Sequence, residues 1–163
     1  QQESGIATLH ITHDQEEALS IADRVAVMRE GRVLQCAAPR ELYARPASRA
    51  VAAFVGHANL WPARVIDART VRTPIGTLSA DARAHAAGAE VAALVRPERV
   101  RLGAAPDSGN TFAGRVERDR FLGSFRRFDL VVAGGTVVVE TASDAAPDAV
   151  HIPPEAVQLL PAD

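Results

Sequence analysis

The pattern of hydrophobic and polar positions changes character near residues 56–59 of this chain of 163 residues. Beyond that point, short runs alternate apolar with polar residues, and Gly, Pro and Asp separate the runs. In one run Phe128, Leu130 and Val132 form a single apolar face, which is typical of a half-buried strand. Many short strands at close spacing predict a small sandwich or barrel. The predicted strands cover residues 61–66, 70–72, 76–79, 90–96, 112–118, 124–132, 136–141 and 149–152.

The first part of the chain mixes strand and helix patterns. Residues 6–11 are a short, mostly apolar run, which predicts a strand buried in a sheet. Asp14 and Glu17 have the spacing of a capping box, so a helix is expected to begin after an Asp14 N-cap. Further along, the pattern predicts a hairpin over residues 24–36 and two short helices over residues 39–43 and 48–55.

Composition is that of a soluble globular protein, with 47% hydrophobic and 23% charged residues. The net charge of −2 gives no general attraction to nucleic acid or anionic lipid, and no apolar run is long enough to enter a bilayer as a helix. The single cysteine, Cys36, rules out an internal disulfide and fits a reducing compartment. The chain does not begin with Met, as expected of a piece cut from a longer protein.

Several motifs carry a family resemblance. The octet Ile11-Thr12-His13-Asp14-Gln15-Glu16-Glu17-Ala18 closely resembles the end of the ATPase subunit of ABC importers. The second half resembles the transport-associated OB-type domain of the same subunits. The segments that extend the resemblance are residues 22–28, 30–35, 39–43, 53–56, 94–98, 121–123 and 152–157.

This resemblance implies a two-part organisation. Residues 1–57 are expected to be the C-terminal remnant of an ABC ATPase domain, and residues 58–163 an OB-type regulatory domain. The expected fold class is mostly β with an α/β N-terminal remnant, that is, an OB-type barrel or sandwich after a truncated P-loop ATPase tail. One departure is the segment 36–39, Cys-Ala-Ala-Pro, where such subunits more often have a Gly-containing turn.

The basic residues limit what this chain can do with ATP. All 18 of them are arginines, and a phosphate-gripping loop of the Gly-x-x-x-x-Gly-Lys-Ser/Thr type needs a lysine. The signature motif and the acidic Walker-B strand are also missing from the sequence. We therefore expect the intact subunit to be a transport-coupled ATPase that uses ATP and Mg, and this chain alone to bind no cofactor and hydrolyse no ATP.

The resemblance makes His13 the switch-loop histidine, the one candidate for both the catalytic and the ATP-contacting role. An imidazole can donate one N–H to the γ-phosphate while a neighbour holds its other nitrogen. The alternative is a surface histidine in a turn. His10 lies outside the motif and is interpreted as structural, and Asp14 as a helix N-cap.

Partners and location follow from the same resemblance. The intact subunit is expected to pair with a second copy of itself and with membrane permease subunits. Its place would be the cytoplasm, peripheral on the cytoplasmic face of the inner membrane through the permease. Importers of polyamines, ferric iron, phosphonates and sugars have such subunits, and the transported substrate cannot be identified from this sequence.

Other functions remain open for the second half. Five arginines flank residues 121–123, and OB folds bind oligonucleotides or small anions on basic faces. The chain could therefore be a free-standing module that binds an oxyanion, whereas a solvated strand face or a dimer contact is the simpler interpretation. Aromatic residues are only 4% of the chain, which disfavours a nucleic-acid partner. The five arginines are Arg115, Arg118, Arg120, Arg126 and Arg127.

Two further expectations concern metals and order. His57, His85 and His151 are too scattered in the sequence to predict a metal site. An apolar strand at residues 6–11 without neighbours tends to recruit another chain. We therefore expect residues 1–36 to be poorly ordered or to pair with a second protomer, and the part from Asn59 onward to be compact.

Overall fold

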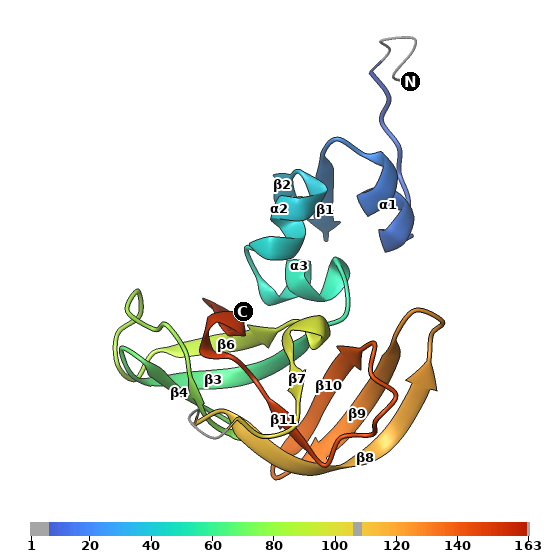
Figure 1. The fold of residues 1–163 in the computed structure, drawn as a ribbon. Helices are drawn as coiled ribbons and strands as arrows, with labels where there is room; N and C mark the ends of the chain where they lie inside the picture. The colour runs from blue at the N-terminus through green and yellow to red at the C-terminus, as the bar shows by residue number, and fades with distance from the viewer. Residues whose placement is uncertain (1–6, 106–108, 163) are drawn as a thin grey trace.

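The computed structural model describes residues 7–105 and 109–162, with a small helical part above two five-stranded sheets (Figure 1). Asp14 caps the first helix by accepting a hydrogen bond from the Glu17 N–H, and Ser48 caps the third by accepting from Val51 N–H. Leu42 and Val51 are fully buried in the core of this part. Its elements are α1 (Gln15–Ile21), β1 (Val25–Arg29), β2 (Arg32–Ala37), α2 (Pro39–Ala44) and α3 (Arg49–Phe54).

The remainder of the chain forms the two sheets, which we call the β domain. One sheet has the strand order β5-β4-β3-β6-β12 and the other the order β10-β9-β8-β11-β7, with antiparallel pairing throughout. The elements are β3 (Asn59–Asp67), β4 (Thr70–Thr73), β5 (Gly76–Ser79), β6 (Glu90–Val95), η1 (Pro97–Arg99), β7 (Arg101–Leu102), β8 (Thr111–Phe121), β9 (Arg126–Val132), β10 (Gly135–Thr141), β11 (Ala149–His151), η2 (Pro154–Ala156) and β12 (Gln158–Pro161).

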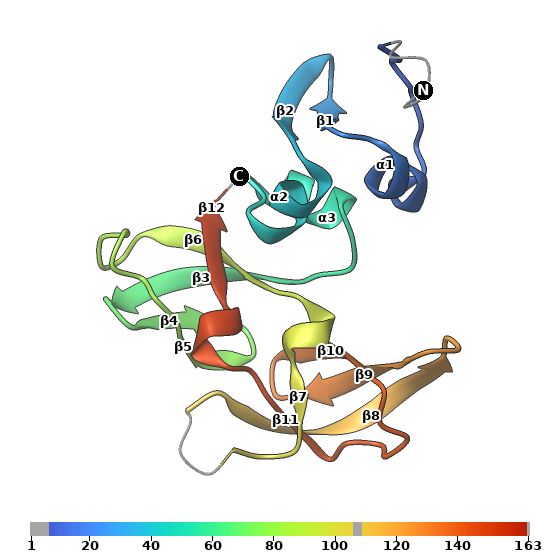
Figure 2. The same cartoon turned by 45° about the horizontal axis from the view of Figure 1, so that its top comes forward.

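The main core contains apolar side chains from both sheets. Phe128, Leu130 and Leu78 are fully buried there, which confirms the apolar face predicted for β9. Strand β6 is buried on both sides, because its odd-numbered residues enter this core while Ala92 and Leu94 pack with Ala52 of α3. The helical part is thus seated directly on the outer face of one sheet, as Figure 2 shows.

The β domain consists of two similar halves. Residues 59–65 and 110–116 share the pattern Asn-x-Trp/Phe-x-Ala/Gly-Arg-Val, and residues 97–102 and 154–159 share Pro-Glu-x-Val-x-Leu. The two copies of the first pattern begin β3 and β8, and the two copies of the second contain the 3-10 helices η1 and η2. Each half also gives its last strand, β7 or β12, to the other sheet.

An asparagine at the start of each half joins the two sheets. Asn59 donates from Nδ2 to the Val138 carbonyl at 2.8 Å and accepts from the Val138 N–H at 2.7 Å. Asn110 binds Ser79 in the same manner, at 3.0 and 2.6 Å. Both side chains are buried and pair with the backbone of a strand at a sheet edge, so each replaces a missing neighbouring strand.

The mostly β fold class is confirmed, with two differences in detail. All eight predicted strands of the β domain are present within a few residues, whereas β7, β12 and both 3-10 helices were not predicted. Residues 7–11 of the predicted first strand form no strand, and Leu9 and Ile11 are 90% and 88% exposed. No strand lies beside them to accept their backbone hydrogen bonds in the described part of the chain. Residues 1–6 lie outside the described residues.

The expectation for residues 1–36 was wrong for most of its length. Val25 and Val27 of β1 pack on Leu42 and Val51 of the same chain, and Ala18 of α1 lies against this cluster. The apolar face of the N-terminal hairpin is therefore buried by α2 and α3 of its own chain. Among the described residues, none of the helices has both the length and the apolar character needed to cross a membrane.

Candidate functional site

His13 lies at a bend immediately before the N-cap of α1, and its side chain is exposed. In the described residues no hydrogen bond or ion pair involves its imidazole. The sequence-predicted site residue is thus held on the surface by its backbone alone, and both ring nitrogens can reach a ligand. Whether it contacts a phosphate stays a prediction.

The residues around His13 fix that bend. The Thr12 hydroxyl accepts from the Asp14 N–H at 3.0 Å, and Asp14 Oδ1 accepts from the Glu17 N–H at 3.0 Å. A hydrogen bond from Thr12, with a further one from His10, lowers the pKa of the Glu17 carboxyl below its ordinary value. His10 Nε2 lies 3.3 Å from the Glu17 carboxylate, and its interpretation as a structural residue stays a prediction. The N-cap role of Asp14 is confirmed.

The arginines near residues 121–123 lie mainly in ion pairs. Arg126 binds the Asp119 carboxylate, and Arg120 binds that of Asp129. Arg127 donates from Nε and Nη2 to Glu140 Oε1 at 2.8 and 2.7 Å, with both side chains mostly buried. These acids neutralise three of the five arginines that the sequence suggested for an anion site.

The two exceptions are Arg115 and Arg118, which are exposed on β8 and have no ion-pair partner in the described residues. Two solvated arginines on an open strand do not form a built anion site. Among the described residues, no group of three or more His, Cys, Asp or Glu could hold a metal ion.

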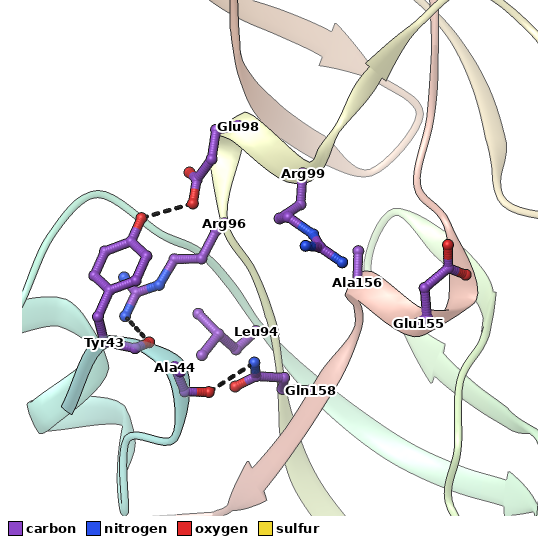
Figure 3. Close-up of a pocket in the computed structure, with 9 residues that line it drawn as sticks. All are labelled: Tyr43, Ala44, Leu94, Arg96, Glu98, Arg99, Glu155, Ala156 and Gln158. Atoms are coloured by element: carbon purple, nitrogen blue, oxygen red, sulfur yellow. Dashed lines mark hydrogen bonds between the residues drawn. The ribbon is translucent and has the colours of Figure 1, made fainter. Parts of the chain in front are cut away.

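A polar pocket of about 220 Å³ lies where α2 meets the β domain (Figure 3). Arg96 is its deepest charged residue and is only 5% exposed. Its guanidinium stacks on the Tyr43 ring with 4.1 Å from Cζ to the ring centroid. Burial lowers the pKa of Arg96 from its ordinary value, yet arginine remains charged at any physiological pH.

Two further hydrogen bonds connect the residues that line the pocket. Tyr43 donates its hydroxyl hydrogen to Glu98 at 2.8 Å, and burial together with this hydrogen bond raises the phenol pKa. Gln158 donates to the Ala44 carbonyl at 3.0 Å, so β12 also reaches α2. In the sequence, residues 94–98 carry only a family signal. Nothing in the sequence indicates that Arg96 contacts residues some 40 to 50 positions earlier.

Comparison with known families identifies a domain in the second half of the chain. A family model of the TOBE domain matches residues 93–160, which extend from β6 to β12. The chain is 42% identical to the spermidine/putrescine import ATP-binding protein PotA of Ruegeria pomeroyi, over 85% of this chain and 38% of that protein. It is 39% identical to the Fe(3+) ions import ATP-binding protein FbpC of Agrobacterium fabrum, over 85% of this chain and 40% of that protein.

A third relative extends the similarity over nearly the whole chain. PotA of Rubrobacter xylanophilus is 41% identical over 98% of this chain and 44% of its own length. The chain thus spans about two fifths of the curated relatives that it matches. Because the relatives share the N-terminal part as well as the TOBE domain, the similarity is not that of an isolated OB-type module.

Among solved structures, ModG has a fold similar to that of much of this chain. The cytoplasmic molybdate-binding protein ModG, with molybdate bound, superposes with a TM-score of 0.55 at 19% identity. The match covers 72% of this chain and 99% of ModG. At this identity the likeness shows the fold alone, and it confirms the OB-type character expected from the sequence. The chain is therefore related to the C-terminal part of the ATP-binding subunits of ABC importers, and it carries their TOBE domain.

Proposed function

We propose that the intact protein is the ATP-hydrolysing subunit of an ABC importer, in which this chain supplies His13 as the switch histidine and the β domain as a regulatory or dimerisation domain. The observation that carries the proposal is the similarity to import ATP-binding proteins over 85–98% of the chain. The division into an ATPase remnant at 1–57 and a TOBE-type domain at 58–163 belongs to this proposal.

The chemistry of His13 supports its role. An imidazole N–H donated to a phosphate oxygen stabilises charge on the transferred group, and such an N–H must be exposed and aimed by a fixed backbone. His13 is exposed, and the capped first turn of α1 fixes its backbone. ATP is the substrate of the intact subunit, which would use Mg together with it.

The proposed partners are a second copy of the subunit and the permease subunits of the importer. Through the permease the protein would be peripheral on the cytoplasmic face of the inner membrane. The names of the relatives include polyamine and ferric-iron import, and we assign neither substrate to this protein.

The test is the substitution His13→Ala in the intact subunit. Hydrolysis should fall by a factor on the order of 10² to 10³, because removing one charge-stabilising donor costs about that much, while ATP binding changes little. His10→Ala is the matched control, because the polar partner of the His10 side chain in the described part of the chain is Glu17, and this variant should leave turnover near that of the wild type. Equal loss of binding and turnover, or no loss of either, would contradict the role of His13.

A second candidate function is a free-standing oxyanion-binding module, and the observation that favours it is the fold shared with molybdate-bound ModG. This function predicts stoichiometric binding of molybdate, sulfate or phosphate by the chain without ATP. The ion pairs of Arg120, Arg126 and Arg127 argue against it, since these cations already have carboxylate partners. Calorimetric titration of the chain with molybdate separates the two candidates.

A further inference from the structure

Arg96 joins two parts of the molecule that are far apart in sequence. Its Nη1 donates to the carbonyls of Ala52, Gly56 and His57 at 3.1, 3.3 and 3.2 Å. Its Nη2 donates to the Tyr43 carbonyl at 3.3 Å. The buried cation is therefore held by backbone carbonyls of α2, of α3 and of the segment that leads to β3, and no carboxylate of the described residues forms an ion pair with it.

Two of these carbonyls, those of Tyr43 and Ala52, lie near the C-terminal ends of helices, where carbonyls lack a hydrogen-bond partner within the helix. The last four carbonyls of a helix have no partner within it, and an arginine near the end of a helix can bind them. Ala52 lies in the last turn of α3, and Tyr43 lies in the last turn of α2. The Arg96 guanidinium of the β domain thus binds carbonyl groups at the C-terminal ends of both α2 and α3.

A second contact strengthens the same junction. The Tyr43 ring lies against the Arg96 guanidinium, and its hydroxyl binds Glu98, two residues after Arg96 (Figure 3). We call Tyr43, Arg96 and Glu98 the junction latch. On the other side of the connecting segment, Arg127 of β9 lies 2.9 Å from His57 Nε2. The connecting segment at Gly56 and His57 is therefore contacted by an arginine from each sheet region, Arg96 and Arg127.

Comparison of the two halves of the β domain shows whether the local turn needs an arginine at position 96. The repeated pattern Pro-Glu-x-Val-x-Leu follows Arg96 in the first half and Pro153 in the second. Both halves form the same 3-10 helix and strand there. Since the turn forms with proline at this position, an arginine is not required to build it, and the long buried cation serves the contact with the helices.

We propose that Arg96 is a positioning residue that locks α2 and α3 onto the β domain, so that a displacement of the β domain is transmitted to the N-terminal part. The path continues through packed residues, because α2 and α3 share a core with β1, and α1 lies against that core. The junction latch is a conformational device of this chain, and it stands independently of the ATPase assignment.

The chemistry of the latch requires arginine. Four carbonyl contacts and a stacked ring use the planar fork of a guanidinium, whereas a lysine ammonium has three donors and does not stack in this manner. Arg96→Lys should therefore behave more like Arg96→Ala than like the wild type. Tyr43→Phe keeps the ring and removes only the bond to Glu98, so its effect should be smaller than that of either Arg96 variant.

The experiment measures the distance between the helical part and the β domain in the 163-residue chain. Spin labels are placed on the native, exposed Cys36 of β2 and on Ala133→Cys in the exposed β9–β10 turn, and their distance distribution is measured by pulsed electron resonance. The wild type should give one narrow distribution, and Arg96→Ala a broad one. Arg99→Ala is the matched control, because Arg99 is an exposed arginine in the same pocket whose side chain forms no hydrogen bond with the described residues, and its distribution should stay narrow.

Hydrogen exchange distinguishes a lost latch from general unfolding. In Arg96→Ala the amides of α3 should exchange at least about tenfold faster, while those of β8 and β9 keep their protection. A narrow label distribution and unchanged exchange in Arg96→Ala would overturn the proposal, as would equal acceleration in all strands. If Arg96→Ala does not fold, Tyr43→Phe must show a smaller broadening of the same kind, and its absence would also overturn the proposal.

Discussion

Substitution of Asn59 by alanine tests the joining of the two sheets. The side chain makes two hydrogen bonds with Val138, of 2.8 and 2.7 Å, and is 4% exposed. Each bond is worth about 1 kcal/mol net, and an unpaired buried backbone group costs about 1–3 kcal/mol. Because Val138 is half-buried, water replaces part of the loss, and we expect Asn59→Ala to lower the free energy of unfolding by about 2–4 kcal/mol.

The second half of the β domain provides an internal comparison. Asn110 binds Ser79 through the same two atoms and is fully buried, so Asn110→Ala should cost at least as much as Asn59→Ala. Urea unfolding followed by the fluorescence of Trp61, the only tryptophan and a core residue, measures both changes. A loss below about 0.5 kcal/mol in both variants, within the range of ordinary surface substitutions, would refute the reasoning.

Three other predictions concern a turn, an ion pair and ATP. A methyl group at Gly134 would overlap the Pro74 carbonyl, so Gly134→Ala should cost about 3 kcal/mol or more in thermal unfolding, whereas Gly123→Ala, at a similar positive φ in open space, should cost about 1 kcal/mol. Hydrogen bonds from the Arg83 side chain and from its backbone N–H lower the pKa of Asp81 to about 2, so this contact favours the folded state above the ordinary pKa and is lost as the pH falls toward 2. In an NMR titration, Arg83→Gln should raise the pKa of Asp81 toward 3.8, while the backbone N–H of residue 83 keeps it below that value. The chain, which has no lysine, should release no phosphate from Mg-ATP, and turnover by the pure chain would contradict this.

The β domain was predictable because its strands follow a simple rule. One face of most strands is buried and the other is exposed, so alternation is visible in the sequence, as in Phe128, Leu130 and Val132. The short strand β7 and the terminal β12 were missed because two to four residues hold too little periodicity. Their signal was present instead as the repeated Pro-Glu-x-Val-x-Leu pattern, which comparison of the sequence with itself would have found.

The N-terminal part shows the limit of local patterns. An apolar run such as residues 7–11 becomes a strand only where neighbouring strands accept its hydrogen bonds, and none does so in the described part of this chain. The N-cap at Asp14 followed from spacing, because it is a local feature. The burial of Arg96 did not, since it depends on contacts between residues 39 to 53 positions apart.

We propose that this chain belongs to a longer protein that binds and hydrolyses ATP. The coding sequence upstream of Gln1 in the source genome tests this directly. We expect a Gly-x-x-x-x-Gly-Lys-Ser/Thr loop there, followed nearer to Gln1 by an apolar strand that ends in acidic residues. A start codon close to Gln1, with no such loop before it, would contradict the claim and favour the free-standing module.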